Sequence, residues 1–196
     1  MGRIVISENA SLDGVLQSPG PTDVPFKYRG WAVDFGGGPD GTFDFERDFG
    51  LPQVQRADAL LLGRVTFEAM QSAWPKATGA LADKLNALPK YVVSSKLTSP
   101  GWNAAVLGDD WLNEVARLRK DLTGDLLVYG SLRLARTLIT KGLADELSLL
   151  VYPLVLGSGD RLFEETDDKI PLRLIDSRAL GGGVLQATYA LPAAKR

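Results

Sequence analysis

Short apolar runs alternate along this chain with segments of helical period, and this alternation restricts the possible folds more than any other feature. The runs that read as strands are 3–9, 58–63, 91–94, 104–107, 125–129 and 146–155. The helical patterns between them are 43–55, 64–72, 77–88, 109–122 and 131–141. Two further strands, 172–180 and 184–191, flank three glycines and predict an antiparallel hairpin. We therefore expect an α/β fold whose twisted sheet is mostly parallel, with helices on both faces and an antiparallel edge.

The segment between the first strand and the first helix is unusually long. Residues 10–42 are rich in Gly, Pro, Asp and Ser, and a loop of this length in a compact domain usually has a function. Thr42 is the expected N-cap of helix 43–55, although Gly50 and Pro52 weaken this helix or split it. We expect the loop to close over a ligand and exclude water.

The composition excludes several kinds of chemistry. The 196 residues include no Cys and no His, which rules out thiolate nucleophiles, disulfides, Cys-ligated metals and imidazole bases. The 22 basic and 24 acidic residues predict no binding surface for nucleic acid or anionic membrane. We therefore expect no metal, and a reaction on a small molecule whose difficult step is carried by an organic cofactor.

Length and hydropathy predict a single cytoplasmic domain. A chain of 196 residues suits one domain over 1–196, and no change in composition marks an internal boundary. The first apolar stretch, Ile4 to Ile6, is too short for the core of a signal peptide, and no run approaches the length of a membrane span.

Three strand ends carry residues suited to an anionic ligand, because ligands of open α/β sheets bind beyond the carboxyl ends of the strands. At the first, Gly63 permits close approach to the backbone, Arg64 can bind phosphate oxygens, and Thr66 can cap the following helix. An ordinary capped helix start with a solvated arginine is the alternative for this segment.

The other two strand ends are similar in character. Ser94 and Ser95 follow the strand 91–94 and offer two hydroxyl groups, but a plain polar strand end has the same sequence. Gly130 and Ser131 begin a helix whose free N–H groups and dipole suit a pyrophosphate, with a simple tight turn as the alternative.

Several other patterns in the sequence resemble functional sites. Gly36, Gly38 and Gly41 match G-x-G-x-x-G, but no apolar strand precedes them, so we interpret them as a turn. Glu46 and Asp48 have the character of solvated helix charges. Trp31, in the long loop, is a candidate for substrate contact.

In order along the chain, these segments resemble the dihydrofolate-reductase-like superfamily. The resemblance is greatest to the reductase half of the bifunctional riboflavin-biosynthesis deaminase/reductase, the RibD C-terminal domain, and to its stand-alone bacterial homologues. The segments that carry it are ISENASLDG (6–14), ADALLLGRVTFEAM (57–70), the Trp74-Pro75 pair, KYVVSS (90–95) and LLVYGSLRLARTLITKGLADELSLLVYPLVLGSGDRLF (126–163). The resemblance implies a three-layer α/β/α fold, an NADPH cofactor and, commonly in the family, a homodimer.

The resemblance also implies roles for particular residues. Arg64 and Thr66 match the motif that holds the phosphates of the cofactor, and Ser94 and Ser95 match the strand end near its 2′-phosphate. The turn that cradles the pyrophosphate corresponds to Gly130, Ser131 and Leu132. Folate reductases carry Gly-Gly at the first two of these positions, so the Gly-Ser pair points to the riboflavin-type branch.

The segment beside the nicotinamide and the substrate corresponds to Ser11, Asp13 and Gly14, and the loop 157–160 corresponds to one that packs against the active-site loop. Asp13 is the first candidate to orient the substrate or to relay a proton through water. Glu46 or Asp48 is the second candidate, since folate reductases carry one acidic residue on the first helix.

Two functional hypotheses remain open at this point. The first is an NADPH-dependent reductase that resembles 5-amino-6-(5-phosphoribosylamino)uracil reductase or dihydrofolate reductase, with hydride transfer to a small heterocyclic or carbonyl substrate. The second is a non-catalytic NADP(H)-binding or regulatory protein on the same fold, because a fold does not determine its chemistry.

Overall fold

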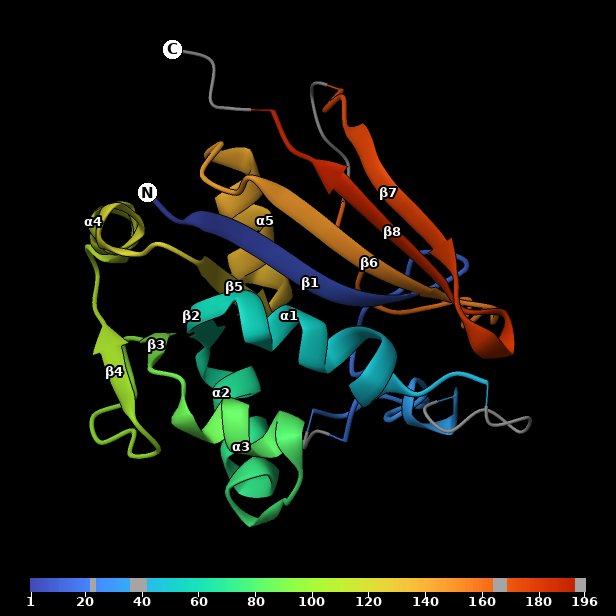
Figure 1. The fold of residues 1–196 in the computed structure, drawn as a ribbon, viewed down its shortest axis with the longest axis horizontal. Coiled ribbons are helices and arrows are strands. Elements are labelled where there is room, and N and C mark those ends of the chain that lie inside the picture. The colour runs from blue at the N-terminus through green and yellow to red at the C-terminus, as the bar shows by residue number, and fades with distance from the viewer. Residues whose placement is uncertain (22–23, 36–41, 164–168, 193–196) are drawn as a thin grey trace.

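A single eight-stranded sheet runs through the protein in the order β4-β3-β2-β5-β1-β6-β8-β7 (Figure 1). The computed structural model describes residues 1–21, 24–35, 42–163 and 169–192. The strands are β1 (Arg3–Ser11), β2 (Ala57–Gly63), β3 (Lys90–Val93), β4 (Ala104–Leu107), β5 (Asp125–Tyr129), β6 (Glu146–Tyr152), β7 (Arg173–Ala179) and β8 (Leu185–Ala190). Neighbours from β4 to β6 pair in parallel, whereas β8 is antiparallel to both β6 and β7. The predicted parallel sheet with a C-terminal hairpin is confirmed.

Helices cover both faces of this sheet and complete three layers. They are α1 (Leu51–Arg56), α2 (Arg64–Ala73), α3 (Ala80–Ala87), α4 (Trp111–Asp121) and α5 (Leu132–Thr140). Because side chains alternate along a strand, Ile6 of β1 packs with Leu138 of α5 on one face, and Val5 packs with Val54 of α1 and Leu85 of α3 on the other. Figure 1 accordingly shows α1 and α5 on opposite sides of β1.

Several predicted boundaries are wrong, and contacts distant in sequence explain them. The predicted helix 43–55 begins as a π-helical turn, η2 (Glu46–Gly50), that continues into α1. Thr42 does not cap it, because its Oγ1 accepts the N–H of Gly182 at 3.0 Å. Asp44 does so instead, accepting the N–H of Arg47 at 2.8 Å.

Other strands and helices differ at one end. β1 extends past the predicted residue 9 because β6 pairs with it as far as Ser11. β6 ends at Tyr152 rather than at 155, since Pro153 has no N–H to donate to the ladder. The helix expected from residue 77 begins at Ala80, after a short 3₁₀ turn, η3 (Trp74–Lys76).

Parts of the long loop are ordered by contacts with the C-terminal half. Val15 forms a β-bridge with Arg161, and the N–H of Leu16 bonds to the carbonyl of Asp160 at 2.8 Å. A short 3₁₀ turn, η1 (Val33–Phe35), follows later in the loop. The glycines of the G-x-G-x-x-G match, Gly36, Gly38 and Gly41, lie outside the described residues. Among the helices of the described ranges, none is both long and apolar enough to cross a membrane.

Candidate functional site

The topology singles out one crevice in the sheet. The chain leaves β1 toward β2 through α1 on one face, and it leaves β5 toward β6 through α5 on the other face. β1 and β5 are neighbours, so their connections diverge at a topological switch point, the place where open α/β sheets bind ligands. β5 ends at Tyr129, opposite Ser7, whereas β1 continues to Ser11. We call the space between these strand ends the switch-point crevice.

Two of the predicted turns meet directly beside this crevice. The Ser131 hydroxyl accepts the N–H of Gly63 at 2.6 Å and donates to Oγ1 of Thr66 at 2.9 Å. One side chain therefore joins the β5–α5 turn to the β2–α2 turn. Thr66 was expected to cap α2, and this bond to Ser131 shows that its hydroxyl points to the neighbouring turn instead.

The backbone here has the close approach and unusual geometry of a binding turn. A Cβ at Gly63 would lie 2.9 Å from the Ser131 hydroxyl, so a larger residue here would displace the Ser131 side chain. Gly130 and Ser131 both have a left-handed backbone, with φ of 56° and 68°. For Ser131 this conformation costs about 1–2 kcal/mol, and strain of this kind concentrates at functional sites.

The two helices that start at these turns offer backbone donors to an anion. The first N–H groups of α2, which begins at Arg64, and of α5, which begins at Leu132, have no acceptor within their own helices. Arg64 is 37% exposed and forms an ion pair with Glu68 one turn later at 2.7 Å. Its guanidinium group can therefore reach a phosphate at the N-terminus of α2 while Glu68 holds its other side.

The third predicted strand end lies next to these two turns. β3 pairs in parallel with β2, so Val93 is level with Gly63 and Ser94 follows at the same edge of the sheet. Ser94 Oγ accepts the N–H groups of Lys96 and Leu97, both at 3.0 Å, and thereby shapes the turn. Ser95 is exposed beside it. The three strand ends thus lie side by side, on β3, β2 and β5.

Ser11 and Asp13 hold a turn rather than an open binding surface. The Asp13 carboxylate accepts the Ser11 hydroxyl at 2.7 Å and the N–H groups of Leu156 and Gly157 at 3.0 and 2.9 Å. The hydrogen bonds from Ser11 and Leu156 lower the pKa of Asp13 to about 2. An acid this strong, already bonded on both oxygens, is suited to fixing the loop 157–160 beside the crevice and not to relaying a proton. Gly14 completes the turn with φ of 79°.

The two acidic residues of the first helix also have structural partners. Glu46 Oε1 accepts the N–H of Leu81 at 3.0 Å and thereby caps α3. Asp48 forms an ion pair with Arg47 at 2.7 Å, and the hydrogen bond from Arg47 lowers the pKa of Asp48. These contacts do not favour either carboxylate as the proton donor.

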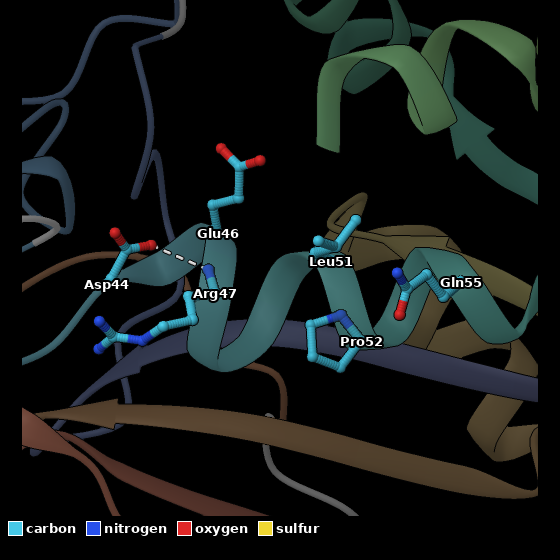
Figure 2. Close-up of a pocket in the computed structure, with 6 residues that line it drawn as sticks. All are labelled: Asp44, Glu46, Arg47, Leu51, Pro52 and Gln55. Carbon is cyan, nitrogen blue, oxygen red and sulfur yellow. Dashed lines mark hydrogen bonds between the residues drawn. The ribbon is translucent and has the colours of Figure 1, made fainter. Parts of the chain in front are cut away.

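A surface pocket of about 400 Å³ lies along the same helix (Figure 2). In Figure 2 the side chain of Glu46 points away from Arg47, whose backbone N–H bonds to Asp44. The residues that line the pocket are Asp44, Glu46, Arg47, Leu51, Pro52 and Gln55. All of them belong to the segment around η2 and α1, and none to the strand ends, so this pocket is separate from the switch-point crevice.

Trp31 belongs to a core cluster. Its side chain is 4% exposed, its Nε1 donates to the carbonyl of Gln17 at 2.9 Å, and its ring packs edge-on against Tyr152. This position favours anchoring of the long loop over the substrate contact that was expected.

Two residues that the sequence analysis missed flank the crevice. Among the described residues, the buried side-chain atoms without a hydrogen-bond partner are Oε1 of Glu8 and the hydroxyl of Tyr129. Glu8 follows Ser7 on β1, and Ser7 is the partner of Tyr129 on β5, so both residues belong to the two strands of the switch point. Their side chains lie on opposite faces of the sheet, because Glu8 shares the face of Ile6 under α5, whereas Tyr129 packs against the cluster under α1. Burial raises the pKa of Glu8 to about 8, and it also raises that of Tyr129. The sequence signal that could have revealed Glu8 is its position in β1. It shares the apolar face of this strand with Ile4 and Ile6, where a carboxylate is unusual.

These features fit a dinucleotide. Buried polar atoms without partners are uncommon and point to a missing ligand or water. The two helix N-termini and Arg64 lie at the neighbouring strand ends and suit phosphate groups.

Comparison with known proteins shows which family the chain belongs to. The model of the RibD C-terminal domain matches residues 3–186. The YyaP protein of Bacillus subtilis strain 168, itself uncharacterised, is 30% identical over 194 residues, which cover 95% of this chain and 94% of YyaP.

Solved structures share the fold at lower sequence identity. A protein of Shewanella sp. PV-4, provisionally assigned to riboflavin biosynthesis, superposes with a TM-score of 0.73 at 20% identity, over 97% of this chain and 99% of its own. The dihydrofolate reductase of Enterococcus faecalis, solved as a complex with NADP(H), gives a TM-score of 0.57 at 15% identity, over 96% of each chain. At these identities the likeness concerns the fold.

Proposed function

Because the chain belongs to the RibD C-terminal domain family, we propose that it is a reductase that binds NADPH at the switch-point crevice and reduces a C=O or C=N bond of a small heterocyclic or carbonyl substrate. The observation that carries this proposal is the junction of the two turns through Ser131, which brings the N-termini of α2 and α5 together. The NADP(H) bound by the folate reductase of the same fold supports the choice of cofactor.

Each part of the site has a defined task in this proposal. The backbone N–H groups after Gly130 hold the pyrophosphate, and Arg64 binds a further phosphate from the start of α2. Ser94 and Ser95 lie at the next strand end and accommodate the 2′-phosphate. Bound NADPH supplies the hydride, while the protein positions the reactants and excludes water.

The cofactor site is tested by titrating the protein with NADPH in a calorimeter. We expect Arg64→Ala to weaken NADPH ten- to a hundredfold, because a charge-assisted hydrogen bond contributes about 1.5–3 kcal/mol. If Arg64 contacts the 2′-phosphate, the affinity for NADH should barely change, whereas equal losses for both cofactors would place Arg64 on the pyrophosphate. Arg117→Ala, in α4, removes a similar exposed arginine that belongs to none of the three strand-end turns, and it should leave both affinities unchanged.

The reductase is tested separately, by following NADPH oxidation with dihydrofolate, a ribosylaminopyrimidine and simple aldehydes. Turnover of any of these supports the proposal. Binding of NADPH without turnover of any of them would favour a non-catalytic NADP(H)-binding protein, and absence of NADPH binding by folded protein would contradict both.

A further inference from the structure

We propose that Glu8 is the acid of the reductase site, whose neutral carboxyl group gives its proton to the substrate heteroatom as the adjacent carbon accepts hydride. This inference rests on the proposed function and adds the proton donor that such a reaction needs. The other candidate carboxylates already have partners within the protein. Asp13, Glu46 and Asp48 are each bonded within the protein, whereas Oε1 of Glu8 has no partner in the described part of the chain.

The position of Glu8 fits the task. Its residue follows the Ser7–Tyr129 pair, so it lies on β1 at the point where β5 leaves the sheet and the crevice opens. The N–H of Gly130, which starts the proposed pyrophosphate turn, bonds to the carbonyl of Ser7 at 3.3 Å. Glu8 is therefore one residue away from the strand contact that joins β1 to the cofactor turn.

The surroundings of Glu8 keep its carboxyl group neutral. The residue is 4% exposed, and it shares a face of β1 with Ile6 and Ala10, which belong to the apolar cluster under α5. A carboxyl group held neutral by an apolar site can donate a hydrogen bond at physiological pH, which an ionised carboxylate cannot do.

Three charged groups on the neighbouring elements, those of Asp13, Arg136 and Arg161, are engaged elsewhere. The charged residues of α5 and of the loops next to it are Asp13, Arg133, Arg136, Asp160 and Arg161. Arg136 donates to the carbonyls of Leu162 and Arg161, and Arg161 donates to the carbonyl of Asp13. Burial is the cause that raises the pKa of Glu8 to about 8, and no cation in the described ranges of the chain contributes to this pKa.

The step balances without a further reactant. The carbon of the C=O or C=N bond gains the hydride that NADPH supplies, and the π electron pair moves to the heteroatom. A heteroatom–hydrogen bond forms as the O–H bond of Glu8 breaks, which leaves Glu8 as a carboxylate. The cofactor is oxidised, the substrate is reduced, and Glu8 regains a proton from water when the product leaves.

The proposal is tested first on the protein without substrate. Infrared difference spectra of wild type and Glu8→Gln at pH 7 should contain the carbonyl band of a neutral carboxylic acid, which the substitution removes. A carboxylate band in its place would overturn the proposal. This measurement needs only folded protein and is independent of the reductase assay.

The second test uses the substrate from the panel above that wild type reduces. We expect Glu8→Gln to lower kcat about a hundredfold or more and to leave the Kd of NADPH within about threefold, because a general acid contributes 10²–10⁴ in rate. Wild-type kcat should fall about tenfold per pH unit above pH 8, and the variant should not show this fall. Glu114→Gln, the same chemical change on α4, is the matched control and should behave as wild type.

A shorter acid guards against a folding defect. Glu8→Asp keeps the proton one methylene farther away, so we expect an intermediate kcat and the same loss of activity at high pH. A kcat of Glu8→Gln within tenfold of wild type would overturn the role of Glu8 but not the reductase. Failure of wild type to bind NADPH would overturn the proposed function itself, together with this role.

Discussion

Ser131 combines a left-handed backbone with a hydroxyl group that joins two turns, and its substitutions separate these two effects. Ser131→Ala keeps the strain and leaves the N–H of Gly63 without its acceptor, so we expect a loss of about 1–3 kcal/mol in the free energy of unfolding. Ser131→Gly loses the same bonds but relieves strain, and we expect it to be about 1 kcal/mol more stable than the alanine variant. Urea unfolding of both variants measures the difference, and equal stabilities would contradict the account of the strain.

At the scale of single residues, the sequence revealed the turns but not the buried groups. Gly63, Arg64 and Ser131 stand out because they follow apolar strands, and this signal is local. Glu8 and Tyr129 do not stand out, because their burial depends on α5 and α1, which come from distant parts of the chain. A polar residue inside an apolar strand looks the same in sequence whether its partner is missing or present.

Among the elements, α3 depends on a side chain 35 positions earlier, since Glu46 accepts the N–H of Leu81. We expect Glu46→Ala to lower the free energy of unfolding by about 1 kcal/mol, the usual effect of removing a helix cap. Glu46→Gln keeps an acceptor oxygen and should retain most of the stability. If Glu46 is structural, kcat of both variants for NADPH oxidation stays within about twofold of wild type. A fall of a hundredfold in both would return Glu46 to the role of proton donor.

The Glu46–Leu81 hydrogen bond shows why the sequence predicts the helices and strands more accurately than the residues at which they begin and end. Apolar periodicity located the strands and the helices, because it reflects which face each element buries. Their ends depend on tertiary partners such as the Thr42–Gly182 and Glu46–Leu81 hydrogen bonds, which no local pattern contains. Pro153 is the exception, since a missing N–H ends a strand by itself.

For the whole molecule, the order of the strands is the feature that local patterns could not supply. Alternation of strands and helices predicts a parallel sheet, but not that β5 inserts between β2 and β1. That insertion places the β2 and β5 turns side by side and sets the switch point next to Glu8. The candidate site is therefore a product of topology, although the residues of its turns were visible in sequence.

Three of the groups with a shifted pKa should make the stability of the whole protein depend on pH in separate ranges. Asp13 has a pKa lowered to about 2, so its contribution is present above pH 4 and is lost only as the pH falls below its ordinary value. Lys90, whose Nζ bonds to the carbonyl of Leu88 at 2.7 Å, has a pKa lowered by burial to about 8. The unfolded chain therefore holds the Lys90 proton longer than the folded one above pH 8, and stability from this group rises there with pH.

Between the pH ranges of Asp13 and Lys90, the Glu8 carboxyl group should make the stability of the protein fall as the pH rises. Its pKa is raised from 4.5 to about 8, so from pH 5 to 8 the folded protein holds a proton that the unfolded chain has released. The contribution of Glu8 to the free energy of unfolding is fully present below pH 4.5. It should fall by at most about 1.4 kcal/mol per pH unit as the pH rises to 8. The slope, measured by urea unfolding at several pH values, should disappear in Glu8→Gln and persist in Glu114→Gln. A wild-type protein whose free energy of unfolding is constant from pH 5 to 8 would show that the Glu8 carboxyl group is ionised in the folded state, and the apolar cluster under α5 would then have to admit water.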